Sequence, residues 1–214
     1  KRQRKYPIFN NAYMMTGSHH LYNYLPTKHE KWLTMIKQEI IDSGLIVDIL
    51  NAKTMEDVFR LLQGCSFLGS FLAYQYTIDM NYSPYINFSE NDFVKAGIGA
   101  IRGIKKCFLC YGNKCEDAIW YVKEHFNDLQ KRYGYTSFHP LLGHEPTLID
   151  LQNCFCETDK YLRAKMPELR IGNVRIKQKY MPHTDPIQFF FPPKWNIVEM
   201  YKYKPIVVPT LFDL

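Results

Sequence analysis

Apolar residues recur every three to four positions through most of the chain, and this spacing predicts a mainly α-helical protein. The segments that follow it are residues 30–43, 67–80, 100–109, 116–132 and 147–163. The first segment places Trp32, Leu33, Ile36 and Ile40 on one side, and Gly44 is its expected stop.

A further helix is predicted from a capping pattern. Thr54 and Asp57 have the spacing at which two residues cap each other's backbone amides. Val58, Leu61 and Leu62 follow at helical spacing, so we expect a helix that starts after Thr54.

The helix predicted at 67–80 carries both apolar and polar side chains of interest. Phe71 and Tyr74 are expected on its buried face. Gln75 and Asp79 lie four positions apart and therefore share one side of the helix. An unpaired carboxylate beside an apolar stripe is costly. Asp79 is therefore expected either to brace a neighbouring loop or to belong to a binding site.

Residues 93–104 suggest a backbone grip for an anion. A short helix, a Gly-x-Gly turn at 97–99 and a second helix would form a helix-hairpin-helix pattern. The glycines let the backbone approach a ligand, and the start of the second helix offers free N–H groups to a phosphate. Arg102, Lys105 and Lys106 add positive charge. The alternative is a helix corner whose glycines serve packing; the glycine spacing fits neither a dinucleotide fingerprint nor a Walker loop.

A polar stripe runs along the helix predicted at 147–163. Asp150, Asn153, Glu157 and Tyr161 fall on one side of it, opposite an apolar face. A solvated surface is the usual explanation of such a stripe. A binding site is the other, because a solvated stripe more often carries Lys and Glu.

The chain changes character beyond Pro167, where repeated prolines predict extended or irregular pieces. We expect a helical domain at 1–165 and a tail at 166–214 that packs on the helical body. Aromatic and basic residues alternate at 189–195. They would either cover the core as a flap, which we favour, or stack on bases.

The charge of the chain favours an anionic partner. The formal net charge is +6, with basic residues gathered at 1–5, 102–106 and 170–179. Nucleic acid is the partner that such clusters favour, and plain solubility is the alternative.

The cysteines give no disulfide framework or metal site. Six are present, and Cys107, Cys110 and Cys115 fit no common zinc spacing, so no metal or cofactor is expected. No apolar run approaches the length of a membrane span, and no signal peptide is visible. We therefore expect an intracellular protein, cytoplasmic or nuclear. The first residue is Lys1, which is compatible with a fused or associated partner domain.

Three stretches resemble a known family in their order along the chain and in their amino-acid sequence. They are residues 71–82 (FLAYQYTIDMNY), 97–104 (GIGAIRGI) and 150–161 (DLQNCFCETDKY). The chain resembles, over roughly residues 10–165, the α-glutamyl/putrescinyl thymine pyrophosphorylase family, also described as the helical domain of 5-hydroxymethyldeoxyuridine DNA kinases. The family is regarded as related to helix-hairpin-helix DNA glycosylases and is linked to phage DNA hypermodification and phage defence.

The resemblance implies a two-lobed helical fold with DNA between the lobes, and it implies roles for individual residues. Asp150 matches the essential aspartate of helix-hairpin-helix glycosylases. The expected base-binding residues are Tyr74, Gln75, Asp79, Gln152, Asn153, Glu157 and Tyr161. The expected phosphate-binding residues are Gly97, Gly99, Arg102, Gly103, Lys105, Lys106 and Lys160.

The chain departs from the glycosylase pattern in three ways. The interval from the hairpin to Asp150 is longer, the hairpin reads Ala-Gly-Ile-Gly rather than Pro-Gly-x-Gly, and no lysine clearly matches a nucleophile. The first expectation is therefore a monofunctional enzyme that flips and excises a modified pyrimidine. One alternative is a transferase that acts on a pyrophosphorylated hydroxymethyl pyrimidine in DNA. Another is a DNA-binding subunit without catalytic activity.

Overall fold

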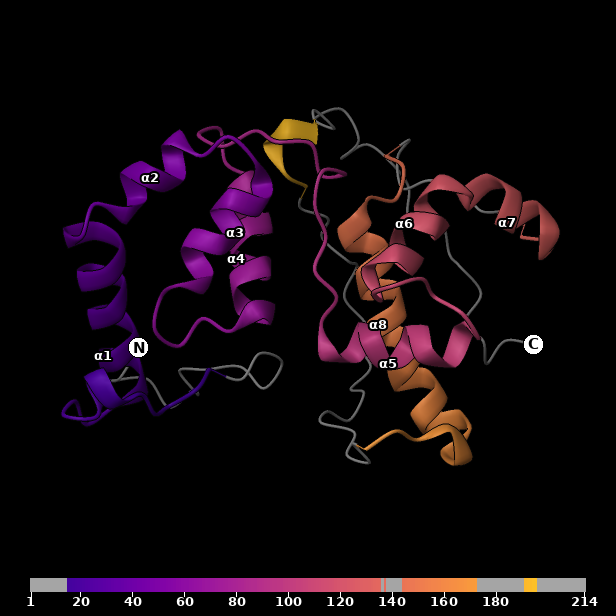
Figure 1. The fold of residues 1–214 in the computed structure, drawn as a ribbon, viewed down its shortest axis with the longest axis horizontal. Coiled ribbons are helices and arrows are strands. Elements are labelled where there is room, and N and C mark those ends of the chain that lie inside the picture. The colour runs from indigo at the N-terminus through magenta and orange to yellow at the C-terminus, as the bar shows by residue number, and fades with distance from the viewer. Residues whose placement is uncertain (1–14, 136, 138–143, 173–190, 196–214) are drawn as a thin grey trace, which may run out of the picture.

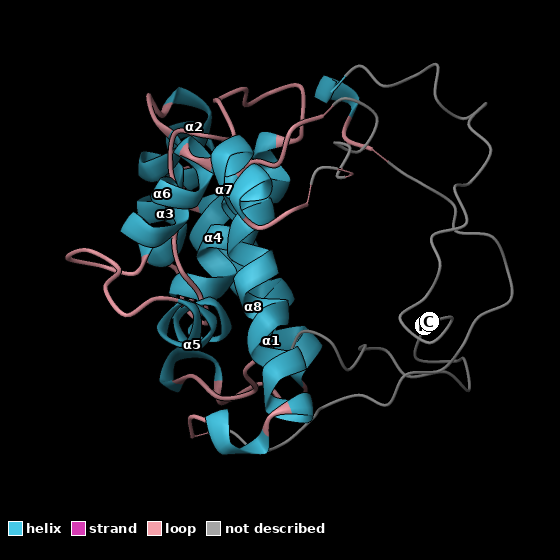
Figure 2. Cartoon of the chain, turned by 90° about the vertical axis from the view of Figure 1, so that its right-hand side faces the viewer, coloured by secondary structure: helices cyan, strands magenta, loops and turns pink. Residues whose placement is uncertain are grey.

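The computed structural model describes residues 15–135, 137, 144–172 and 191–195 of this chain. Within these ranges the protein is mainly helical and forms no β-strand, as predicted (Figure 2). The α-helices are α1 Lys28–Met35, α2 Leu45–Asn51, α3 Met55–Gln63, α4 Ser70–Asn81, α5 Ile98–Cys107, α6 Glu116–Glu124, α7 Phe126–Arg132 and α8 Leu148–Lys165. A π-helix at Ile36–Asp42 extends α1, and 3-10 turns lie at His20–Tyr22, Pro167–Leu169 and Pro193–Trp195.

The helices form two groups with one continuous core. Helices α1–α4 lie on one side and α5–α8 on the other, with the segment that follows α4 running between them (Figure 1). Phe93, in that segment, packs on Phe59 of α3 at 5.1 Å and on Tyr74 of α4 at 5.8 Å between ring centroids. The connecting segment therefore packs on α3 and α4 through the Phe93 ring.

The first predicted helix is present, but part of its buried face was assigned wrongly. Trp32 and Met35 face the core, and the Trp32 indole donates to the carbonyl oxygen of Thr16 at 2.9 Å. Because these two residues set the orientation of α1, Leu33 turns to solvent and is 64% exposed. Gly44 has φ +82° and ends the segment, which confirms the expected stop.

The capping box of α3 is confirmed. The Asp57 carboxylate accepts from the Thr54 amide, and the Asp57 amide donates to the Thr54 hydroxyl, both at 3.0 Å. The next helix begins later than predicted, at Ser70. Phe67 has φ +65°, which a right-handed helix does not allow, and its ring stacks on Trp32 instead. Phe71, expected in the core, is 41% exposed.

The short helix predicted before the Gly-x-Gly turn is wrong, because residues 93–97 are not helical. Side chains from other helices take the amides there. The Ala96 amide donates to Glu116 of α6 at 3.0 Å, and the Gly97 amide donates to Gln152 of α8 at 3.1 Å. Lys95 also pairs with Glu116, at 3.0 Å. The helix-hairpin-helix relationship and the two-lobed cleft stay predictions.

The segment predicted as one helix at 116–132 is two helices. Helix α6 ends at Glu124, and α7 begins at Phe126 after His125, whose ψ of +18° breaks the helical repeat. The helix predicted at 147–163 is confirmed as α8, with Thr147 as its N-cap. None of the described helices combines the length and apolar composition needed to cross a membrane.

Several predicted features lie outside the described residues. They are the basic arm at 1–5, most of the basic cluster at 170–179, and most of the proline-rich tail with Phe189 and Phe190. The division into a domain at 1–165 and a tail at 166–214 stays a prediction.

Candidate functional site

Helices α5 and α8 cross closely, and two glycines make the contact. A Cβ atom at Gly103 would lie 2.0 Å from the carbonyl oxygen of Phe155, and one at Gly99 would lie 2.4 Å from the sulfur of Cys156. A larger side chain at Gly103 would require movement of the α8 backbone, whereas one at Gly99 would require at least a shift of the Cys156 side chain. Burial in this contact argues against the phosphate contact predicted for Gly103.

The turn before α5 offers fewer free amides than the sequence suggested. The Gly97 amide is buried and donates to Gln152, so it is not available to a phosphate. Gln152 is itself only 1% exposed and serves as the internal acceptor. Helix α5 has no side-chain N-cap, and Ile98 at its first position is 71% exposed. Any backbone contact with an anion therefore falls to Ile98 and Gly99, because Ala100 is fully buried.

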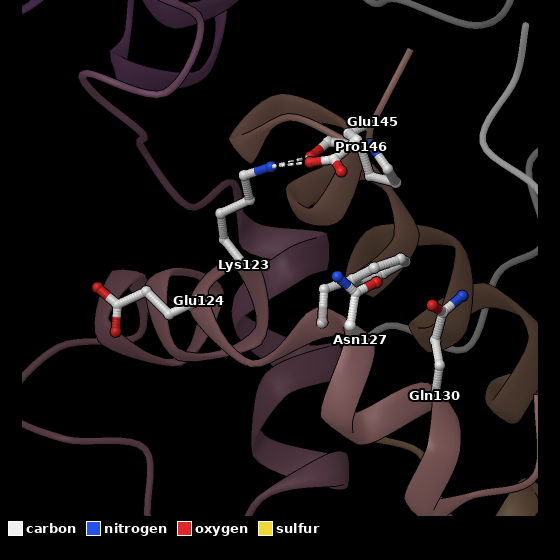
Figure 3. Close-up of a pocket in the computed structure, with 7 residues that line it drawn as sticks. Lys123, Glu124, Asn127, Gln130, Glu145 and Pro146 are labelled. Carbon is white, nitrogen blue, oxygen red and sulfur yellow. Dashed lines mark hydrogen bonds and ion pairs between the residues drawn. The ribbon is translucent and has the colours of Figure 1, made fainter. Parts of the chain in front are cut away.

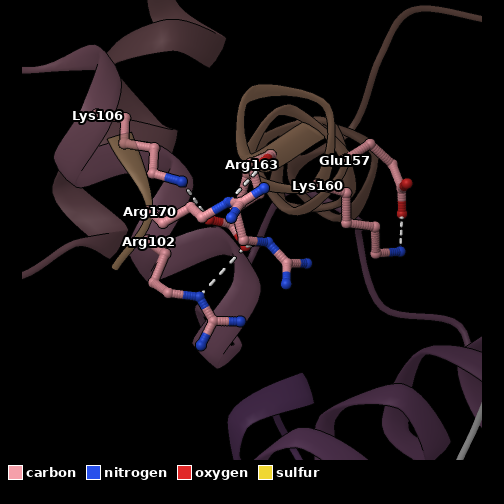
Figure 4. Close-up of polar contacts among 7 residues, drawn as sticks. Arg102, Lys106, Glu157, Lys160, Arg163 and Arg170 are labelled. Carbon is pink, nitrogen blue, oxygen red and sulfur yellow. Dashed lines mark hydrogen bonds and ion pairs between the residues drawn. The ribbon is translucent and has the colours of Figure 1, made fainter. Parts of the chain in front are cut away.

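A buried carboxylate gathers three cations where α5 and α8 cross (Figure 4). Asp159 of α8 is 0% exposed. Its oxygens lie 2.6 Å from Nζ of Lys106, 3.2 Å from Nε of Arg102 and 3.2 Å from Nε of Arg163. Arg170 adds a fourth cation by donating to the Arg163 carbonyl oxygen at 3.1 Å.

Asp159, Arg102, Lys106, Arg163 and Arg170 are called the Asp159 cluster below. The cluster carries a net positive charge. Burial alone would raise the pKa of Asp159, but hydrogen bonds from Lys106 and Arg102 outweigh it and hold that pKa below its ordinary value. Because one carboxylate faces several cations, a surplus of positive charge remains. The Lys106 side chain is 3% exposed and pairs with Asp159 in the interior. The Arg102 side chain is 20% exposed and reaches the surface.

The other two predicted phosphate ligands lie apart from this cluster's centre. Lys105 is exposed on α5 and lies near Cys115, where burial raises the pKa of the thiol and Lys105 lowers it in part. Lys160 is exposed on α8 and pairs with Glu157, three positions earlier on the same helix (Figure 4).

Asp150 has a structural task at the start of α8. Its Oδ2 accepts from the amide and the hydroxyl of Thr147, at 2.8 and 2.9 Å, which forms a capping box. Burial raises the pKa values of Tyr74 and Tyr82, and the Asp150 charge raises them further. Asp150 is therefore close to α4 and to the residue that follows it.

The predicted base-binding residues divide into buried and exposed sets. Tyr74 is 1% exposed, and its hydroxyl donates to the Phe93 carbonyl oxygen, so its ring belongs to the core. Gln152 is buried, whereas Asn153, Glu157 and Tyr161 are exposed along α8. This exposed stripe agrees with the predicted polar side of the helix, and its part in binding stays a prediction.

The remaining two candidates lie on α4. Gln75 is half-buried, and its Nε2 has no hydrogen-bond partner among the described residues. Asp79 borders an apolar hollow of about 210 Å³ between α4, α3 and the π-helix, and partial burial there raises the pKa of its carboxyl.

A second hollow holds none of the predicted site residues. It measures about 140 Å³ and lies between α6, α7 and the segment before α8 (Figure 3). Lys123 lines it and pairs with Glu145 at 3.7 Å. Within the described ranges, no three His, Cys, Asp or Glu side chains come together as a metal site.

Sequence reasoning missed Asp159, the centre of the cationic cluster. One local signal was present, because Arg163 follows Asp159 by four positions on the same helix. The contacts with Arg102 and Lys106 had no such signal, because they join residues more than fifty positions apart.

A family model described as "5-hmdU DNA kinase, helical domain" matches residues 1–171. No curated protein and no solved structure matches the chain.

Proposed function

The chain belongs to the family of 5-hmdU DNA kinase helical domains, and on this premise we propose that it binds DNA carrying a hydroxymethylated pyrimidine and serves group transfer at that base. The family description names 5-hmdU in DNA as the group acted on. It therefore favours the base-modifying alternative over base excision. In the proposed reaction the N-glycosidic bond stays intact.

The observation that carries the DNA-binding part is the Asp159 cluster. Its surplus positive charge lies at a surface where Arg102 and Arg170 are reachable. Guanidinium groups bind phosphates in fixed geometry, and such contacts hold the DNA backbone in place without reading its sequence. Asp159, itself paired with Lys106, fixes Arg102 in advance, and this lowers the entropy that Arg102 loses on binding.

The proposed reaction is phosphoryl transfer to the hydroxymethyl group of the base. The hydroxymethyl oxygen attacks the γ-phosphorus of a nucleoside triphosphate, the bond to the bridging oxygen breaks, and the diphosphate leaves. The hydroxyl proton passes to a base. We assign this role to Asp150, whose Oδ1 is not used by the capping box.

Binding to matched oligonucleotides tests the proposal. The full chain should bind DNA with one 5-hydroxymethyluracil more tightly than the same DNA with thymine. Replacing Arg102 by Gln should weaken binding to both by about fivefold, because one phosphate contact is lost. Lys105→Gln removes the same charge from the same helix outside the cluster and should weaken binding less. Equal effects of the two variants, or no binding at all, would contradict the proposal.

A further inference from the structure

A short tail segment, residues 191–195, lies beyond the family match and packs on the helical domain. Its 3-10 turn, yellow in Figure 1, lies beside the loops that join the two helix groups. The Lys194 ammonium donates to the carbonyl oxygens of Asn81 at 3.0 Å and Phe88 at 3.1 Å. Asn81 is the last residue of α4, so Lys194 stabilises that helix end. The segment is thus anchored at a defined place.

The Trp195 ring occupies a cage made by three residues of the matched region, Tyr82, Glu90 and His144. The indole stacks on His144 with 3.8 Å between ring centroids and a 23° angle between planes. Tyr82 meets it edge-on at 5.9 Å. Its N–H donates to Oε2 of Glu90 at 2.7 Å. The cage therefore holds a flat heteroaromatic ring by stacking and by one N–H contact.

The indole leaves polar atoms of the cage unused. Glu90 is 8% exposed; its carboxylate accepts from the indole and also contacts the Tyr82 hydroxyl, and its Oε1 makes no close hydrogen bond among the described residues. Nε2 of His144 is buried and equally lacks one within the described chain. Unsatisfied buried polar atoms are costly. A ligand with more polar atoms than indole would satisfy them better.

The cage adjoins the residue to which we assign the chemistry. Burial raises the pKa of Tyr82, and the nearby charges of Glu90 and Asp150 raise it further. Asn91, next to Glu90, accepts from the Leu148 amide at 3.2 Å and so ties this loop to the start of α8. A base in the cage would therefore lie on the Asp150 side of the molecule.

We propose that the cage of Tyr82, Glu90 and His144 is the binding site for an extruded pyrimidine base, and that Trp195 occupies it as an internal plug when DNA is absent. This inference rests on the proposed function. Enzymes that act on a base in DNA take it out of the stack and hold it between flat side chains. The N3–H of a uracil-type ring would replace the indole N–H at Glu90, and the tail segment would leave.

Vacating the cage gives the first test. In the full chain, Trp195→Ala should bind a single-stranded oligonucleotide with one central 5-hydroxymethyluracil about tenfold more tightly, because the base no longer competes with the indole. The same oligonucleotide with an abasic analogue at that position should show no gain. Tyr85→Ala removes an aromatic ring that is 79% exposed in the same loop, and it should change neither affinity.

Glu90→Leu, added to Trp195→Ala, should cancel most of the gain, because the N3–H of the base then has no acceptor in the cage. If Trp195→Ala binds both oligonucleotides as the unaltered chain does, the plug is overturned while the proposed function stands. If the unaltered chain and all variants fail to bind DNA, the proposed function itself fails.

Tryptophan fluorescence gives a second test, which does not depend on tighter binding by Trp195→Ala. In the unaltered chain, the oligonucleotide should release Trp195 from His144 and change the tryptophan emission. Trp195→Phe, which keeps Trp32 and Trp120, should lose most of that change. An identical change in both proteins would show that Trp195 stays in place, and would overturn the inference.

Discussion

Asp57 and Asp150 hold the same position in two helices, the third residue, and each closes a capping box with the threonine before the helix. Single carboxylates of this kind stabilise the N-terminal ends of α3 and α8. Two others, Glu116 and Asp159, join segments distant in sequence through lysine or arginine partners. The residue scale is therefore where structural and chemical roles must be separated.

The matched capping boxes separate the two roles of Asp150. Asp150→Asn and Asp57→Asn should each lower the free energy of unfolding by at most about 1 kcal/mol, because asparagine still accepts a hydrogen bond. Only Asp150→Asn should slow conversion of 5-hydroxymethyluracil in DNA, by roughly a hundredfold, because an amide takes no proton. Urea denaturation and product mass measure the two effects. Full activity in Asp150→Asn would restrict Asp150 to capping.

Asp159 should make the free energy of unfolding depend on pH in the acidic range. Its folded pKa is lowered, so its contribution is complete above its unfolded pKa of about 4 and is lost as the pH falls through the folded value. The free energy of unfolding should therefore fall more steeply below about pH 4 in the unaltered chain than in Asp159→Asn. Urea titrations at a series of pH values measure this slope, and equal slopes would refute the assignment.

At the scale of elements, the crossing of α5 and α8 decides where the cations meet. Gly103 brings the two backbones together, and Arg102 and Lys106 then lie on the side of α5 that faces Asp159. Local preference does not explain a glycine within a helix, because glycine weakens helices. Close approach of the neighbouring helix explains it.

Gly103→Ala should destabilise the protein by about 3 kcal/mol, because the new methyl group would overlap the Phe155 carbonyl oxygen. Gly69→Ala is the matched control: no atom lies within 4 Å of its added carbon, and no positive φ strains the alanine. Thermal denaturation of both variants measures the difference. A Gly103→Ala protein as stable as Gly69→Ala would mean that the helices do not cross this closely.

At the scale of the whole molecule, the proposed function and base excision predict different products. The full chain, given a nucleoside triphosphate and DNA with 5-hydroxymethyluracil, should yield a nucleoside of higher mass after digestion. The strand should remain uncut by alkali, because no abasic site forms. Mass spectrometry and a strand-cleavage gel read the two outcomes. Abasic sites without a heavier nucleoside would favour the glycosylase alternative.

Salt should separate the two contributions to DNA binding in the whole molecule. Phosphate contacts release counterions, so affinity should fall steeply as salt rises, and less steeply in Arg102→Gln. Selectivity for the modified base over an abasic analogue should change little with salt, because stacking in the Tyr82, Glu90 and His144 cage involves no counterion. Anisotropy titrations from low to physiological salt measure both quantities.

The sequence by itself determined the helical class, most helix positions and the Thr54 capping box, because these follow from spacing within a few residues. It also carried the family resemblance that the match at 1–171 confirms. It did not reveal that residues 93–97 are not helical, because Glu116 and Gln152 supply acceptors from other helices. It placed Tyr74 in a binding role although the ring packs on Phe93.

Tertiary structure alone decided the Asp159 cluster, the close approach at Gly103 and the cage around Trp195. Each joins segments separated by fifty or more positions, as Trp195 and Glu90 do. The spacing of apolar residues shows which side of a helix is buried, but not which other helix packs on that side. Buried charges acquire their partners only through that packing, and this is the physical reason why the centre of the candidate site was not visible in the sequence.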